Sequence, residues 1–512
     1  MDISLEECRT GITSTLFTGN VFVVIGTLVC SLFSAAIGAN DVANSVGTSI
    51  GSGVVTMRQG ILIAFVFEFL GAFFLGSTVV STVSSGITNV KYFTVPVHFM
   101  AGMFSAMFSG FLWLITATLF SLPVSTTHSI VGAVIGFAVV SQGWTSVLGD
   151  LSLFRWYDLI PPFKITTGLC FKTDNPITQT IKMMPIFFGV SLFIFALFFV
   201  SKGLSNVISL TLLESFLTAI VVGLLSYIVH VIFFRPRMRT EIPEDMLDKH
   251  RSLLSIDILR PNTSIDMNAI KTAPQSDSSQ EEADVILEVE GDKEEVVDQG
   301  EVVVSNRSST GTGLNETEKE EENKDEPVEV LDEELQKTLY KKLQTKSADK
   351  LFAPLMVLSC MFLATAHGSN DIANSIGPYA AILTTFRTHS VDGEAEVPPA
   401  ALALGAVSLT IGLAVLGHKV IQTIGKKLTK ITALNGSVIQ ISAAATVLVG
   451  SALGLPISTS HILIGAVIGQ ALARKTSVNW KMVRGIIYSW LLTLPVASLT
   501  SALIYHLLTF GL

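Results

Sequence analysis

Two short blocks of the sequence combine an acid with amides and hydroxyls. Residues 38–48 read GANDVANSVGT and residues 368–378 read GSNDIANSIGP, so one pattern, G-x-N-D-[VI]-A-N-S-[VI]-G, occurs twice. Each block interrupts an apolar run, where an ionised carboxylate is costly and indicates a functional site. Hard cations prefer oxygen ligands. We therefore predict a hard cation at Asp41 and Asp371. The predicted cation ligands are Asn40, Asp41, Asn44, Ser45, Asn370, Asp371, Asn374 and Ser375. The alternative is that these residues only join helices through hydrogen bonds.

A second repeated block, P-[VI]-S-T-[TS]-H-x-x-[VI]-G-A-V-I-G, occupies residues 123–136 and 456–469. Proline suits the first turn of a helix, and the free N–H groups of that turn favour anions. Hydroxyl groups add further donors. The pattern predicts anion-binding hydroxyls at Ser125, Thr126, Thr127, Ser458, Thr459 and Ser460. The alternative is that these triplets are ordinary helix N-caps.

Two other polar side chains lie inside apolar runs. Glu68 stands near the start of the run 61–83, and Gln440 stands in the run 438–455. An ionisable group within a membrane span is a candidate functional residue. We predict that Glu68 takes part in coupling; the alternative is an ion pair within the scaffold.

Composition places the chain among polytopic membrane proteins. It has 512 residues, of which 49% are hydrophobic, and several apolar runs reach the roughly 20 residues that a spanning helix needs. An enzyme is disfavoured, because the Ser, His and Asp residues lie in spans without a nucleophile-elbow context. The expected surroundings are a lipid bilayer, and no nucleic acid partner is predicted.

The chain divides into five predicted segments. They are a first transport repeat (1–141), an atypical connector (142–183), a pair of transmembrane helices (184–234), an acidic disordered loop (235–350) and a second repeat (351–512). Residues 239–350 hold 29 of the 42 acidic and 14 of the 33 basic residues, a composition typical of disorder. Basic residues on both sides of this loop place it in the cytoplasm.

The two repeats are predicted to run in opposite directions across the membrane. Arg58, the basic turn 426–430 and the basic residues at 474–484 all fall on the cytoplasmic side only with that threading. Inverted repeats with Gly-interrupted helices at the midplane are typical of secondary transporters. The predicted fold is therefore an all-α bundle, an inverted-topology repeat with broken helices at the midplane.

These motif pairs resemble those of the inorganic phosphate transporter (PiT) family, the sodium–phosphate symporters, over residues 20–140 and 351–510. The resemblance implies sodium-coupled import of phosphate by an inverted-repeat fold that is often dimeric. It implies no cofactor, sodium ions as co-substrate at Asp41 and Asp371, phosphate at the hydroxyls of the two triplets, and a part in coupling for Gln440. We expect the plasma membrane. Two features depart from the family. Residues 142–183 show no further apolar span, and Gln440 stands where members often have Glu.

The charge of the apolar spans supports the same interpretation. These spans contain Asp41, Asp371 and Glu68 and almost no Lys or Arg, so a phosphate would be repelled unless cations bound first. We predict a sodium-coupled phosphate symporter. Alternatives are a proton-coupled phosphate, metal-phosphate or sulfate permease on the same scaffold, or a non-transporting phosphate sensor or surface receptor.

Overall fold

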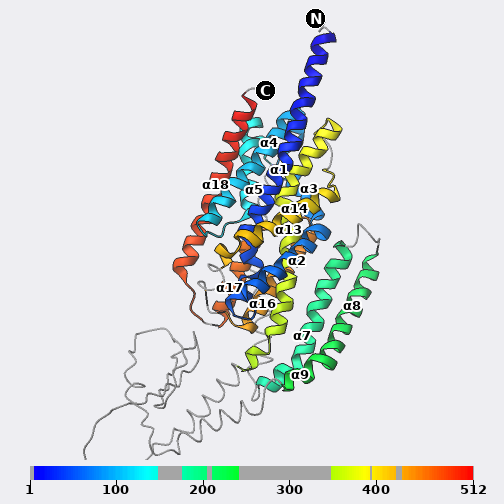
Figure 1. Cartoon of the computed structure of the whole chain (residues 1–512), viewed down its shortest axis with the longest axis vertical. Helices are drawn as coiled ribbons and strands as arrows, with labels where there is room; N and C mark the ends of the chain where they lie inside the picture. Colours follow the sequence, from blue (N-terminus) through cyan, green and yellow to red (C-terminus); the bar gives the residue numbers. More distant parts are fainter. Residues whose placement is uncertain are drawn as a thin grey trace, which may run out of the picture. The chain divides into compact units, whose positions relative to one another are not determined.

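The computed structural model describes residues 5–147, 176–203, 210–240, 347–391, 395–421, 429, 431–474 and 476–510. Within these ranges the chain forms helices and no β-strand (Figure 1). Residues 1–238 and 344–512 make one compact unit, the helical body. Residues 239–343 form the second unit, and the predicted acidic loop lies almost wholly outside the described residues.

Eight helices of the described residues are long and apolar enough to cross a membrane, which confirms the predicted polytopic all-α class. These candidate spans lie in α1 (Leu5–Gly51), α2 (Met57–Leu75), α4 (Pro96–Leu119), α7 (Pro176–Phe198) with the π-turn η3 (Phe199–Gly203), α8 (Leu212–Val229) with η4 (His230–Phe234) and the start of α9 (Arg235–Thr240), α14 (Pro399–Leu416), α16 (Ala433–Ala452) and α18 (Trp480–Thr509). The remaining α-helices are α3 (Ser77–Ser85), α5 (Thr126–Gln142), α13 (Ala353–Thr388) and α17 (Thr459–Arg474).

The prediction that helices break at the G-x-N-D motifs is wrong. Both α1 and α13 continue as regular α-helices through their motifs. The glycines serve close packing instead of unwinding, because a Cβ at Gly38 would lie 1.9 Å from the carbonyl oxygen of Leu409, and one at Gly368 would lie 2.2 Å from that of Glu68. Near the site, non-helical backbone occurs just before α5 and α17 and not at the motifs. It lies in the loops that contain Pro123 and Pro456.

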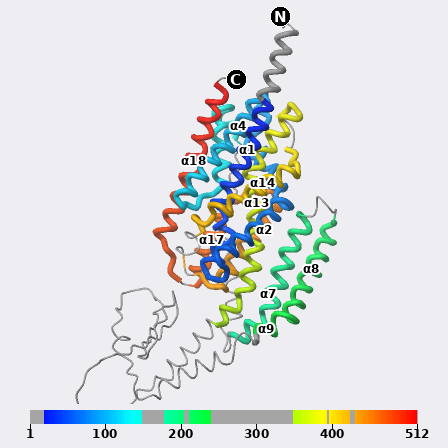
Figure 2. The backbone as a smooth tube through the Cα atoms, viewed as in Figure 1, coloured from blue at the N-terminus to red at the C-terminus, as the bar shows by residue number. Residues whose placement is uncertain are grey.

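The two halves of the chain interlock through equivalent positions. In the helical body, α1 packs on α14, α13 packs on α2, and α1 and α13 lie side by side (Figure 2). The loosely matching segments 71–76 and 412–417 carry these contacts: a Cβ at Gly71 would lie 2.0 Å from the oxygen of Thr365, and one at Gly412 would lie 1.8 Å from that of Ala35. This exchange of contacts fits an internal repeat. The inverted threading of the repeats across a membrane stays a prediction.

This packing predicts that replacing glycine with alanine lowers the free energy of unfolding at one position and not at another. Gly38→Ala should destabilise the helical body by about 1–3 kcal/mol or more, because the added methyl group meets a backbone oxygen that cannot move alone. Gly465→Ala on α17 is the control, since no atom of the described residues lies within 4 Å of its Cβ position. The melting temperature of each variant in detergent would test this. Equal melting temperatures would contradict the proposed helix contact.

The helices α7 and α8 form a hairpin, coloured green in Figure 2. Its glycines Gly189 and Gly223 bring the two backbones together, and the rings of Phe195 and Phe362 stack at 4.4 Å to attach α7 to α13. The predicted pair 184–234 corresponds to this hairpin, although α7 already begins at Pro176, inside the predicted connector. Residues 148–175, where the question of a further span falls, lie outside the described residues.

Candidate functional site

The two motif aspartates meet in the middle of the helical body. Asp41 on α1 and Asp371 on α13 are each 1% exposed. One carboxylate oxygen from each and a ring nitrogen of His367 all lie within 4.8 Å of one another. Side chains at i and i+4 of a helix share a face, so the regular α13 presents His367 and Asp371 together. The centre of the site is thus two buried acids and one imidazole.

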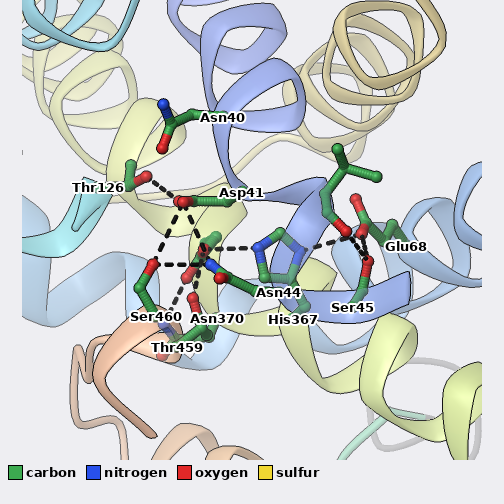
Figure 3. A network of polar contacts seen from close by, with 12 residues as sticks. Asn40, Asp41, Asn44, Ser45, Glu68, Thr126, His367, Asn370, Thr459 and Ser460 are labelled. Atoms are coloured by element: carbon green, nitrogen blue, oxygen red, sulfur yellow. Dashed lines mark hydrogen bonds and ion pairs between the residues drawn. The ribbon is translucent and has the colours of Figure 1, made fainter. Parts of the chain in front are cut away.

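Both repeated blocks contribute to this centre (Figure 3). The Thr126 hydroxyl donates a hydrogen bond to Asp41 Oδ2, and the Thr459 hydroxyl donates to Asp371 Oδ2 at 3.0 Å. The Ser460 hydroxyl reaches across to Asp41 Oδ1 at 3.3 Å. The structure therefore brings part of the predicted cation ligands and part of the predicted anion-binding hydroxyls into one site: Asp41, Asp371, Asn44, Thr126, Thr459 and Ser460.

The triplet serines also cap their helices. Ser125 Oγ accepts a hydrogen bond from the backbone N–H of His128 at 3.2 Å, and Ser458 Oγ accepts from that of His461 at 3.3 Å. The two serine oxygens are 2.8 Å apart, so the N-termini of α5 and α17 meet. Each N-terminus carries a partial positive charge, and two of them here converge on one place. The N-cap interpretation is correct for these two serines, while the adjacent hydroxyls face the carboxylates.

Two further hydroxyls join the halves. Thr127 donates to the carbonyl oxygen of Ile457 at 3.0 Å, and Ser460 donates to that of Val124 at 3.2 Å. These contacts are equivalent in the two repeats and tie each pre-helix loop to the opposite triplet. The phosphate-binding role of the triplets stays a prediction.

The motif asparagines behave differently in the two halves. Asn44 Nδ2 donates to Asp41 Oδ1 at 3.2 Å and to Ser460 Oγ at 2.7 Å. Its equivalent Asn374 is fully buried, and neither of its amide atoms has a partner among the described residues. In the second half it is Asn370 that donates to its aspartate, at 2.7 Å. Each carboxylate therefore accepts a hydrogen bond from one motif amide. In the first half this asparagine follows the aspartate in the sequence, and in the second half it precedes the aspartate.

The motif serines and the two predicted coupling residues lie in different surroundings. Ser45 Oγ donates to Glu68 Oε1 at 2.5 Å, whereas Ser375 Oγ lies 2.8 Å from Ser34 Oγ. Gln440 belongs to a separate buried group. It donates to the hydroxyls of Thr48 and Ser49, both at 2.7 Å, and accepts from that of Ser359 at 2.8 Å.

Sequence reasoning missed His367. Its Nε2 lies 2.9 Å from Asp371 Oδ2, and its Nδ1 lies 3.2 Å from Glu68 Oε1, with all three side chains almost fully buried. The sequence did contain an indication of its role: His367 stands four residues before Asp371, which puts the two side chains on the same face of a helix. A comparison of the two repeats does not single out His367, because the first half has no counterpart. The residue equivalent to His367 is Ile37, and the residue equivalent to Glu68 is Leu409. The two halves thus share the aspartates and differ in the His–Glu pair.

The site offers oxygens that the protein itself does not use. Asn44 Oδ1, Glu68 Oε2 and Asn374 Oδ1 are buried and have no hydrogen-bond partner among the described residues. Buried polar atoms are normally paired, so such atoms beside two carboxylates require a ligand or a rearrangement. Carboxylate and amide oxygens fit a hard cation. The adjoining helix N-termini fit an anion.

Comparisons with known proteins agree with this chemistry. A sequence model described as the phosphate transporter family matches residues 37–501. Inferred phosphate permeases of Pyrococcus abyssi and Chlamydia pneumoniae are 30% and 31% identical, over 94% and 95% of this chain and 97% and 98% of theirs. A solved structure described as the sodium-dependent phosphate transporter is 29% identical with a TM-score of 0.71, over 96% of this chain and all of its own.

Proposed function

Because the chain belongs to the phosphate transporter family, we propose that it imports inorganic phosphate together with sodium ions. Phosphate transport follows from the family, which is not a family of enzymes. Sodium coupling and the direction of transport are our proposal. It includes the plasma membrane as the location, a cytoplasmic loop at 235–350, an inverted repeat and a homodimer.

The observation that carries the proposal is the meeting of two acids with two helix N-termini. Asp41 and Asp371 lie beside the first turns of α5 and α17, within hydrogen-bond reach of Thr126 and Thr459. Phosphate is an anion, so the bare carboxylates would repel it. Sodium ions bound to the carboxylate and amide oxygens would cancel that repulsion, and the N-terminal dipoles and hydroxyls would then hold the phosphate.

This arrangement gives a physical reason for obligatory coupling. Without cations, the acids oppose phosphate; bound phosphate in turn adds negative charge that attracts cations to the acids. Each ligand therefore favours the other, which is the reciprocity that any coupled binding must obey. The name of the similar solved structure, a sodium-dependent phosphate transporter, supports sodium as the coupling ion.

The rival functions make different predictions for one measurement. Radiolabelled phosphate uptake in a phosphate-transport-deficient cell should be strong in sodium and nearly lost when choline replaces sodium. Uptake that persists in choline and rises with acidity would favour a proton-coupled permease. Preference for labelled sulfate would favour a sulfate permease. Purified protein in liposomes that binds phosphate but moves none would favour a sensor or receptor.

A further inference from the structure

The asparagine that precedes each aspartate lies in a different network in the two halves. Asn370 Nδ2 donates to Asp371 Oδ1 and to the carbonyl oxygen of Ile457, both at 2.7 Å. Asn40 Nδ2 instead donates to Thr118 Oγ1 at 3.1 Å and to the carbonyl oxygen of Leu122 at 3.0 Å. An amide carries two N–H donors, and Asn40 has directed both of them away from its aspartate.

Thr118 is the side chain among the groups that hold the Asn40 amide; the others are the backbone carbonyl oxygen of Leu122 and the backbone N–H of Val124. Thr118 is fully buried on α4, and its own hydroxyl proton goes to the carbonyl oxygen of Leu114 at 2.8 Å. Its oxygen therefore remains as an acceptor for the Asn40 amide. The equivalent residue of the second half is Ser451, which is 4% exposed and whose Oγ has no partner among the described residues. The acceptor is thus used in one half only.

We propose that Thr118 is a positioning residue for cation binding at Asp41. By holding the Asn40 amide, Thr118 keeps that amide from donating to the Asp41 carboxylate, as Asn370 does to Asp371. An amide proton on a carboxylate occupies the lone pair that a cation needs, and it must leave before the cation enters. Asp41 already accepts one amide, from Asn44, so Thr118 keeps Asn40 from adding a second one. This inference rests on the proposed sodium coupling.

The test is Thr118→Val, which keeps the shape of the side chain and removes its acceptor. Without that acceptor, only the Leu122 carbonyl oxygen and the Val124 N–H hold the Asn40 amide. Hydrogen bonds to charged groups are the stronger ones, so we expect the amide to turn to Asp41. The sodium concentration for half-maximal uptake should rise about three- to tenfold. The half-saturating phosphate concentration, measured at saturating sodium, should stay within about twofold. Thr118→Ser keeps the hydroxyl and should behave as wild type.

Two controls separate this effect from damage to the helix. Thr116 lies on the same helix and donates to Leu112 in the same way, but it is exposed, so Thr116→Val should leave sodium dependence unchanged. Ser451→Ala should also have no effect. Stabilisation of the purified variants by added sodium gives a second readout, because it reports cation binding even where uptake is weak.

The outcomes are distinct. If wild-type uptake does not need sodium, the proposed function fails. If wild-type uptake needs sodium but Thr118→Val matches Thr116→Val in both readouts, only the role of Thr118 fails. A shift of equal size in Thr118→Ser would also overturn it, because the hydroxyl would then not be the cause.

Discussion

Replacing Asp41 with Asn is expected to abolish sodium-dependent phosphate uptake while the protein still reaches the cell surface. The amide has the shape of the acid and keeps one of its two oxygens, so it can still accept from Thr126 or from Ser460, although not from both, and the packing is preserved. What it lacks is charge. At about 4 Å and an effective dielectric constant of about 20, two unit charges attract by about 4 kcal/mol, which is more than a hundredfold in cation binding.

The matched control is Asp349→Asn. Asp349 is half-buried and accepts from Thr432 and from the backbone N–H groups at the start of α16, away from the two acids. Its replacement should lower stability and leave sodium-dependent uptake in place. Labelled phosphate uptake with sodium or choline, normalised to surface expression, measures both variants. Normal uptake by Asp41→Asn would refute the cation site.

Asp371→Asn should also lose uptake, by the same charge argument. The two variants differ in what remains, because Asp371 also lies beside His367, whereas Asp41 accepts only hydroxyl and amide donors in the described contacts. We expect the residual sodium binding of the two variants to differ for that reason. The sodium-dependent shift in melting temperature of each purified variant would measure it.

The repeated motifs predicted that Asp41 and Asp371 meet, because a polar pattern inside an apolar run must be shielded from lipid, and two copies of it can shield each other. The motifs did not predict how the glycines act. Gly38 and Gly368 fit equally well as points of unwinding or as points of close packing, and only the neighbouring carbonyl oxygens of Leu409 and Glu68 decide. The position of a partner helix's backbone is not encoded in the local pattern of either motif.

The differences between the two halves could not be predicted from the repeated motifs either. Asn40 and Asn370 occupy the same place in matching motifs, yet one donates to Thr118 and the other to Asp371. A search for repeated residues finds what the halves share and passes over what only one of them has. His367 is the clearest case, since Ile37 stands in its place in the first half.

Replacing Glu68 with Gln is expected to reduce uptake at least tenfold. Glu68 Oε1 accepts from Ser45 and lies 3.2 Å from the imidazole of His367, which in turn contacts Asp371. Leaving a buried polar group without its partner typically costs about 1–3 kcal/mol, and more where the group is charged. If Glu68 acts on transport through His367, its replacement should weaken the binding of sodium and phosphate. If Glu68 only holds the scaffold together, its replacement should lower the free energy of unfolding.

A double-mutant cycle separates these two roles. Residues that act as one unit give non-additive effects, so Glu68→Gln combined with His367→Gln should lower uptake hardly more than the stronger single change. The control is Glu214→Gln, the same substitution at an exposed N-terminal position of α8, which should leave uptake unchanged. A Glu68→Gln protein with a lowered melting temperature but unchanged half-saturating sodium and phosphate would make Glu68 a scaffold residue. A stable protein with altered sodium dependence would place the His–Glu pair in the coupling step, and would give a reason why only one half of the repeat carries it.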